Sequence, residues 1–247
     1  MNNDYNTFRQ EEFAVSEDLN QSLSVIRQSV AKNMTRDEAK EWFHEFSHPY
    51  MELMTFYKCA IMEVETKFKV LNEEFSLGND CNPIENIETR LKTPESILGK
   101  LQRNNWPVTV ESIESNINDI AGVRIVCSFQ SDIYMLADAL LKQDDVTLLV
   151  KKDYIANPKP NGYRSLHMII ATPIFLHNEK RMMKVEVQFR TLAMDTWASL
   201  EHRINYKKDN NGITPHVKQE LFECAALSAE IDRRMQAIQD TTADKNR

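Results

Sequence analysis

The chain has 247 residues, 42% of them hydrophobic, and a formal net charge of −7. This length allows one sizeable domain with a helical extension and excludes a second full catalytic domain. The acidic balance disfavours broad electrostatic binding to nucleic acid or anionic membranes, so an anion site must be concentrated. Because we find neither a signal sequence nor a membrane-spanning apolar run, and the four cysteines are widely separated, we expect a soluble, cytoplasmic protein with reduced thiols.

Helical patterns dominate the first third of the chain. Residues 17–32, residues 36–46 and a long stretch from about Pro49 to Phe75 are predicted helices, and the last has an apolar stripe at three- and four-residue spacing. Such a stripe is typical of a protein core or a subunit interface. Turn-forming residues between Gly78 and Pro83 then separate this extension from the middle of the chain.

The middle of the chain changes to strand periodicity. Apolar, β-branched segments predict strands at residues 121–129, 146–150, 166–175 and 182–190, with helices at residues 132–142 and 192–206. Thr214 and Pro215 begin a last helix that reaches about Asp240. We therefore expect a mixed α/β sheet flanked by helices. Its predicted divisions are a helical N-terminal extension (1–80), a catalytic domain (81–208) and a C-terminal helix (209–247).

A basic segment is the first of four that suit nucleotide chemistry. Arg90 and Lys92 precede a predicted helix on which Ser96, Lys100 and Arg103 are spaced to share one face. A polyphosphate would fit that face, although solvated basic residues are the ordinary explanation for such a cluster. The chain contains neither a dinucleotide-binding glycine turn nor a P-loop, so a nucleotide site here would be of another kind.

The second segment places Asp119 just before the strand that contains Gly122 and Arg124. A carboxylate at a strand end is the hard oxygen ligand that magnesium on a polyphosphate requires, and a simple turn residue is the alternative. Arg124 lies within an apolar strand, where a charge needs an anion or an aromatic ring as its partner.

The other two segments combine recognition with a possible base. The loop from Lys151 to His167 contains a glycine turn, aromatic rings, an amide and several cations, which favours nucleobase recognition over a plain polar hairpin. In the next strand, alternation places Glu186, Gln188 and Arg190 on one face. If that face is the floor of a cleft, Glu186 can bind a cation and accept a proton from an attacking hydroxyl.

The order of these motifs resembles that of RelA/SpoT-family synthetase domains over about residues 83–208. The matching segments include Asp119-Ile-Ala-Gly-x-Arg124, Lys159-Pro-Asn-Gly-Tyr-Arg-Ser-Leu-His167, Val185-Glu-Val-Gln-x-Arg-Thr191 and Trp197-Ala-Ser-Leu-Glu-His202. Because the chain is short and lacks the hydrolase domain of the long enzymes, it is similar to a small alarmone synthetase, and residues 194–202 favour the RelP-like branch.

This resemblance implies a nucleotidyltransferase-like fold that moves the β,γ-diphosphate of ATP onto the 3′-hydroxyl of GDP or GTP in the stringent response. It implies that Asp119 and Glu186 are catalytic and hold Mg²⁺, with Glu186 as general base. The residues implied to bind ATP, with Arg103 added from helix spacing, are Arg90, Lys92, Ser96, Lys100, Arg103 and Arg124. Those implied to bind GDP or GTP, with Tyr163 stacking on guanine, are Lys152, Lys159, Asn161, Tyr163, His167 and Gln188.

The resemblance also predicts a homotetramer, which agrees with the apolar residues of the last helix, more than one helix face normally buries. It leaves the choice between GDP and GTP open, because residues 151–153 occupy the position that tunes this choice in long synthetases. Three alternatives remain: a toxin enzyme that modifies tRNA or adenine nucleotides, an inactive nucleotide- or RNA-binding module, and an interaction protein. The net charge of −7 disfavours tRNA binding, and the presence of both Asp119 and Glu186 disfavours an inactive site. We expect no membrane partner and no stable nucleic-acid partner.

Overall fold

The computed structural model describes residues 24 and 26 and residues 35–78, 82–206 and 214–245. Apart from Ser24 and Ile26, the helix predicted at residues 17–32 lies outside these ranges. The chain forms two compact units, one made of Met1–Cys59 with Leu91–Ile120 and the other of Ala60–Arg90 with Ala121–Arg247. The domains predicted from the sequence, with boundaries at residues 80 and 208, are defined by function as well as by structure. They therefore stay a prediction.

The first unit contains the beginning of α2 (Arg36–Gly78) together with α3 (Pro94–Arg103) and α4 (Val110–Asn116). α3 begins where the sequence predicts, because the Thr93 hydroxyl accepts a hydrogen bond from the Ser96 N–H and Pro94 occupies the first turn. Its apolar face is buried through Ile97, Leu98 and Leu101. The sequence analysis did not predict α4, a short helix of seven residues.

The helices predicted at residues 36–46 and from Pro49 are one continuous helix, α2, so the predicted break is wrong. An internal proline removes one backbone hydrogen bond and costs about 3 kcal/mol. The carbonyl left without its donor belongs to Glu45, whose position is exposed, and water can therefore reach it. Phe46, Tyr50 and Leu53 are buried on both sides of the proline, and this continuous packing offsets the lost bond.

The second unit is built on a five-stranded mixed sheet, which confirms the predicted fold class. Along the sheet the strands follow the order β1-β2-β5-β4-β3. Their bounds are Ile84–Leu91, Ala121–Cys127, Thr147–Asp153, Leu166–Phe175 and Lys180–Thr191 for β1 to β5. β2 runs parallel to β5, whereas β4 is antiparallel to both β5 and β3.

The edge strands are where the predicted elements differ most from the structure. β1 was not predicted, because its sequence IENIETRL is mostly polar and its residues are largely exposed at the sheet edge. β3 continues beyond the predicted end at Val150 to Asp153, since Lys151, Lys152 and Asp153 all pair with β4. β2 ends at Cys127 rather than at Phe129, which instead precedes the first turn of α5.

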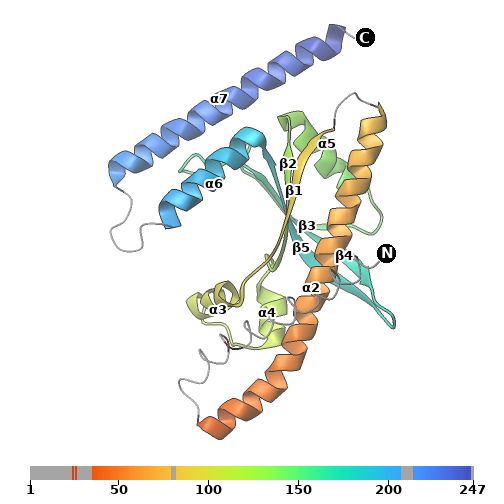
Figure 1. The fold of residues 1–247 in the computed structure, drawn as a ribbon, viewed down its shortest axis with the longest axis vertical. Helices are drawn as coiled ribbons and strands as arrows, with labels where there is room; N and C mark the ends of the chain where they lie inside the picture. Colours follow the sequence, from red (N-terminus) through yellow and green to blue (C-terminus); the bar gives the residue numbers. More distant parts are fainter. Residues whose placement is uncertain (1–23, 25, 27–34, 79–81, 207–213, 246–247) are drawn as a thin grey trace, which may run out of the picture. The chain divides into compact units, whose positions relative to one another are not determined.

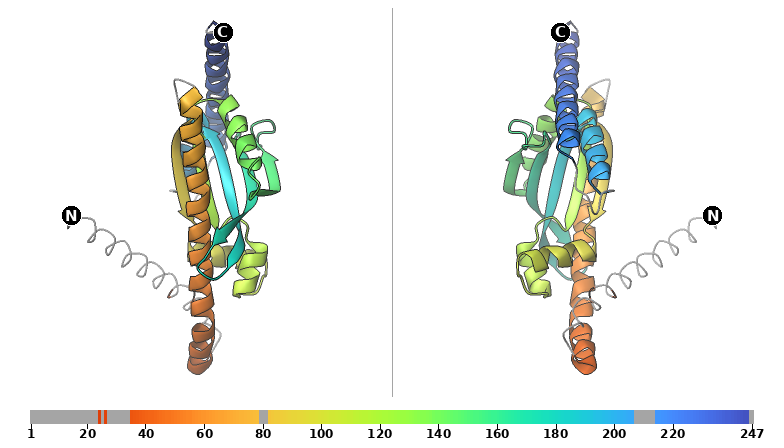
Figure 2. Two further views of the ribbon diagram at one scale, coloured as in Figure 1. Left: turned by 90° about the vertical axis from the view of Figure 1, so that its right-hand side faces the viewer. Right: turned by 90° about the vertical axis from the view of Figure 1, so that its left-hand side faces the viewer.

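Helices cover both faces of the sheet (Figures 1 and 2). The part of α2 from Ala60 and helix α5 (Gln130–Leu141) lie on one side, and α6 (Leu192–Tyr206) and α7 (Pro215–Lys245) lie side by side on the other. On the α2 side the ring of Phe189 packs edge-on against Phe68, with ring centroids 5.6 Å apart. No helix in the described ranges is both long and apolar enough to cross a membrane.

Candidate active site

Four predicted site residues form a row across one face of the sheet. The strand register pairs Arg124 with Gln188, Gln188 with His167, and His167 with Lys152. Directly paired residues point to the same face of a sheet, so this row shares the face of Glu186, two residues from Gln188 on β5. The residues between them, such as Val187, are fully buried on the opposite face. The alternation predicted for β5 is therefore confirmed.

A cavity of about 230 Å³ opens on this face beside the row. It is lined by residues of β1, β2 and β5, namely Glu88, Thr89, Arg90, Gly122, Val123, Arg124, Glu186 and Gln188. Predicted ATP ligands and the predicted general base thus line the same cavity. Its volume is below the several hundred Å³ typical of whole-ligand pockets, and it suits a phosphate or ribose rather than a complete nucleotide.

Arg124 has the anionic partners that its place in an apolar strand required. Its guanidinium Nη1 lies 2.8 Å from a carboxylate oxygen of Glu88 and 3.6 Å from one of Asp195 on α6. The Arg124 Nε is buried and has no hydrogen-bond partner within the described part of the chain. A buried donor without a partner is costly, and an anionic ligand in the adjoining cavity would satisfy it.

In the first unit, Asp119 forms ion pairs with two of the predicted ATP-binding lysines. Its carboxylate oxygens lie 2.8 Å from Lys92 Nζ and 2.9 Å from Lys100 Nζ. Burial by itself would raise the pKa of Asp119, but hydrogen bonds and positive charges from both lysines outweigh burial and lower it. Asp119 is therefore ionised throughout the neutral range. Ser96 and Arg103 remain exposed on α3, near its two ends.

Glu186 is held from two sides in the second unit. Gln188 Nε2 donates a hydrogen bond of 2.8 Å to one carboxylate oxygen, and His167 Nδ1 lies 3.3 Å from the other. The other ring nitrogen of His167, Nε2, lies 2.8 Å from the hydroxyl of Tyr163. Two sequence motifs, one with Tyr163 and His167 and the other with Glu186 and Gln188, thus form one connected group.

The loop before β4 presents an aromatic face that a cation covers. Lys159 Nζ lies 4.7 Å from the ring centroids of both Tyr154 and Tyr163. A base that stacks on this face of Tyr163 must displace Lys159, which could then turn to the phosphates of the same nucleotide. Gly162 has a φ of +88° in this loop, and a Cβ at this position would lie 2.5 Å from the Cβ of Ala225 on α7.

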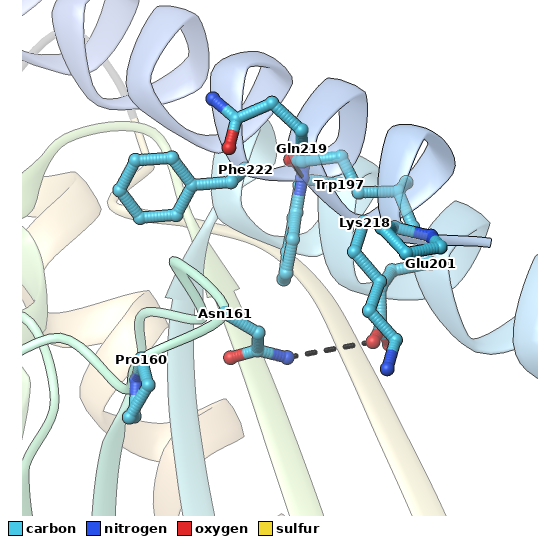
Figure 3. Close-up of a pocket in the computed structure, with 9 residues that line it drawn as sticks. Pro160, Asn161, Trp197, Glu201, Lys218, Gln219 and Phe222 are labelled. Atoms are coloured by element: carbon cyan, nitrogen blue, oxygen red, sulfur yellow. Dashed lines mark hydrogen bonds between the residues drawn. The ribbon is translucent and has the colours of Figure 1, made fainter. Parts of the chain in front are cut away.

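Asn161 lies in a second, larger cavity of about 740 Å³ (Figure 3). Its lining residues come from the loop, α6 and α7: Pro160, Asn161, Trp197, Glu201, Pro215, Lys218, Gln219, Leu221 and Phe222. The Asn161 side chain donates a 3.4 Å hydrogen bond to Glu201 and accepts one of 3.2 Å from the Tyr163 N–H. An amide beside a carboxylate offers both acceptors and a donor to a nucleobase edge, and the volume is sufficient for a base.

Sequence reasoning did not assign Asp195 and Glu201 to the site, and it left Arg190 without a role. Asp195 lies in the first turn of α6 and contacts arginines on two different strands. Both acidic residues lie within residues 194–202, which contributed only to the family resemblance. The one available signal was the position of Asp195 in the first turn of the helix that follows the strand of Arg190, which suggests a local ion pair but does not identify Arg124 as a second partner.

Comparison with known proteins places this site in a family. Residues 89–211 match a region found in RelA / SpoT proteins. The chain is 46% identical to the GTP pyrophosphokinase YwaC of Bacillus subtilis over 182 residues, which cover 74% of this chain and 86% of that protein. It is similar in structure to the small alarmone synthetase 2 of B. subtilis, with a TM-score of 0.71 and 42% identity, covering 78% of this chain and 98% of that chain.

A second solved structure shows a relative with a bound nucleotide. It is the small alarmone synthetase 1 of B. subtilis bound to its product pppGpp, with a TM-score of 0.71 and 34% identity over 78% of this chain and 97% of that chain. The sequence match, the structural match and the clustered motifs agree with one another. The chain belongs to the RelA/SpoT family, and within it to the small alarmone synthetases.

Proposed function

We propose that this chain is a (p)ppGpp synthetase that transfers the β,γ-diphosphate of ATP to the 3′-hydroxyl of GDP or GTP, giving ppGpp or pppGpp and AMP. The observation that supports this most is the polar row on the sheet, in which Gln188 and His167 contact the carboxylate of Glu186 and Arg124 lines the same cavity. The relationship to a GTP pyrophosphokinase and to a synthetase bound to pppGpp supports the same reaction. We further propose that it acts in the cytoplasm in the stringent response.

In the proposed reaction the 3′-oxygen of the acceptor attacks the β-phosphorus of ATP, and the bond from that phosphorus to the α,β-bridging oxygen breaks. Glu186 accepts the proton of the attacking hydroxyl, and the bridging oxygen leaves with AMP. Gln188 and His167 keep the carboxylate of Glu186 in a fixed orientation. Positioning of this kind supplies much of the rate enhancement in phosphoryl transfer, since little covalent chemistry is left to the protein.

The basic residues would neutralise the charge that develops on the phosphates. Arg90 and Arg124 line the cavity beside Glu186, and Arg124 has the buried Nε that needs an acceptor. Lys92 and Lys100 are paired with Asp119. We propose that these two lysines exchange Asp119 for the ATP phosphates when the nucleotide binds, because phosphate oxygens carry more charge than one carboxylate.

We propose Asp119, in the first unit, and Glu186, in the second, as magnesium ligands because of the chemistry of their side chains. Magnesium at nucleotide sites is usually held by one or two carboxylates together with phosphate oxygens, and both residues supply carboxylates. When bound, the ion would polarise the transferred phosphoryl group and neutralise its charge.

The acceptor nucleotide is proposed to bind at the loop before β4. Tyr163 would stack on guanine, Asn161 would hydrogen-bond to its edge from the larger cavity, and Lys159 would contact the phosphates. The phosphate contact predicted for His167 requires its ring to leave Glu186 or Tyr163, because each of these engages one of its two nitrogens. Lys152 stands beside His167 in the row and extends the positive surface for these phosphates. Gln188 would support the ribose. Arg103 and Ser96 are proposed to contact ATP from the exposed face of α3.

The test of this function supplies the purified chain and Mg²⁺ with ATP and, separately, with GMP, GDP, GTP or tRNA. We expect a new nucleotide product with GDP or GTP and none with tRNA, whose acceptor stem needs a basic surface that a chain of net charge −7 does not favour. Modification of tRNA in place of guanine nucleotides would replace this proposal with the toxin alternative.

A homotetramer of about four times 28.8 kDa is also proposed. The predicted stripe of α2 does not support it, because Leu53, Tyr57 and Val64 are buried within the chain. The support comes from α7, where a line of apolar residues is exposed: Leu227 at 65%, Ile231 at 56%, Met235 at 48% and Ile238 at 58%. Contiguous exposed apolar surface of this kind usually marks an interface between subunits.

Changing Ile231 to glutamate is expected to dissociate the tetramer, because a charge would replace apolar surface at the centre of this line. Phe222→Glu is a poorer probe, because Phe222 also lines the cavity of Asn161. Light scattering at micromolar concentration measures the result, with Arg233→Glu on an exposed position of α7 outside this line as the control. A wild-type chain that is monomeric and fully active would remove the tetramer from the account.

A further inference from the structure

Arg190 on β5 is a buried cation for which the proposed reaction has no use. Only 6% of the residue is exposed. Its Nη1 donates a 2.8 Å hydrogen bond to Asp195, and its Nη2 donates one of 3.0 Å to the hydroxyl of Tyr163. Burial of an arginine costs solvation free energy. The two directed hydrogen bonds of Arg190 therefore indicate that it positions the groups it contacts.

The hydrogen bonds continue from Arg190 to the proposed general base. The Tyr163 hydroxyl meets Nε2 of His167 at 2.8 Å, and Nδ1 of His167 lies 3.3 Å from Glu186. Arginine can only donate and an ionised carboxylate can only accept, so the two ends of the series set its direction. His167 must present its Nδ1–H to Glu186, because two lone pairs would otherwise face each other. Its Nε2 then accepts the hydrogen of Tyr163, whose oxygen accepts from Arg190.

We infer that Arg190 is a positioning residue, which acts through the Tyr163 hydroxyl and His167 to hold Glu186 in the orientation that receives the 3′-hydroxyl proton. This inference rests on the proposed function. It gives Tyr163 two separable parts: the ring serves the binding of guanine, and the hydroxyl serves the orientation of Glu186. Asp195 secures the other side of the guanidinium and lies 3.6 Å from Arg124, which lines the cavity of Glu186.

The geometry requires arginine rather than any cation. The two bonds leave from different nitrogens of one planar group, toward Asp195 on α6 and Tyr163 in the loop. A lysine ammonium keeps the charge but has no rigid fork, so it cannot hold both partners in the same geometry. Arg190→Lys therefore removes the alignment while retaining the charge beside Asp195.

The experiment compares wild type, Tyr163→Phe, Arg190→Lys and the double variant, with Arg234→Lys as a matched control on exposed α7. It measures kcat, the KM of GDP and of ATP, and the thermal unfolding temperature. For Tyr163→Phe we expect kcat to fall about tenfold to a hundredfold, as for other residues that orient a ligand group. Its KM for GDP should remain within about threefold of wild type, because the ring that stacks is retained.

The double variant gives the decisive comparison. If Arg190 acts through the Tyr163 hydroxyl, the kcat of the double variant should be no more than about twofold below that of the less active single variant. The reason is that the effects of residues that act as one unit are not additive. A double variant whose loss equals the product of the single losses would overturn the inference, as would Tyr163→Phe with wild-type kcat. If Arg190→Lys or the double variant unfolds at a much lower temperature than wild type, the inference is tested by the kcat of Tyr163→Phe alone, because this change removes only one oxygen. Failure of wild type itself to make product would reject the proposed function, and the two failures are therefore distinguishable.

Discussion

Replacing Glu186 with glutamine is expected to reduce synthesis to below about one hundredth of the wild-type rate, the scale of a lost general base. The amide cannot accept a proton, and it has no charge to place beside a cation. Its size is unchanged, and its single amide oxygen can still accept one of the two hydrogen bonds, from Gln188 or from His167. The Kd of ATP measured without Mg²⁺ should stay within about threefold of wild type, because base catalysis contributes to the transition state and not to ground-state binding.

Single-turnover rates and ATP titration measure these two quantities separately. Glu179→Gln makes the same chemical change in the exposed turn between β4 and β5, and it should leave both unchanged. Synthesis by Glu186→Gln within about tenfold of wild type would remove the residue from the role of general base.

Loss of the Tyr163 ring is expected to weaken acceptor binding far more than donor binding. Stacking of a base on an aromatic side chain is worth about 1 to 3 kcal/mol, so Tyr163→Ala should raise the KM of GDP about fivefold to more than a hundredfold. The KM of ATP should change by less than about twofold, because the stacking is made with the acceptor base alone. The kcat should fall as well, since this variant also removes the hydroxyl that contacts His167.

Initial rates with each substrate varied in turn give the two KM values. Phe175→Ala removes an aromatic side chain that is 70% exposed at the end of β4, and we expect it to change neither value. Equal increases in both KM values for Tyr163→Ala would show that the tyrosine supports the fold of the loop rather than the acceptor.

The central part of the fold could be predicted from sequence because its strands and helices follow simple periodicities. β4 and α6 have the predicted bounds, Leu166–Phe175 and Leu192–Tyr206. β1 could not be predicted, since an exposed edge strand is stabilised by pairing with its neighbour and carries charged residues with no apolar period. The break expected at Pro49 was wrong because burial on both sides of the proline outweighs its local cost.

The types of residue in the site were predictable, but their partners were not. The register that aligns Arg124, Gln188 and His167 depends on the order of strands in the sheet, which is a tertiary property. The pairing of Lys92 with Asp119 spans 27 positions, and the bond from Arg190 to Tyr163 also spans 27. Sequence motifs identify which groups are present, whereas distances decide which of them act together.

The central claim is best tested by following a label on the γ-phosphate of ATP in the presence of GDP, Mg²⁺ and the full chain. Transfer of the β,γ-diphosphate predicts that the label appears in ppGpp, and that one unlabelled AMP forms for each ppGpp. Digestion of the isolated product with a 3′-pyrophosphohydrolase should then release the label as pyrophosphate and regenerate GDP. Formation of ADP, or recovery of the label only as inorganic phosphate or pyrophosphate, would contradict the account.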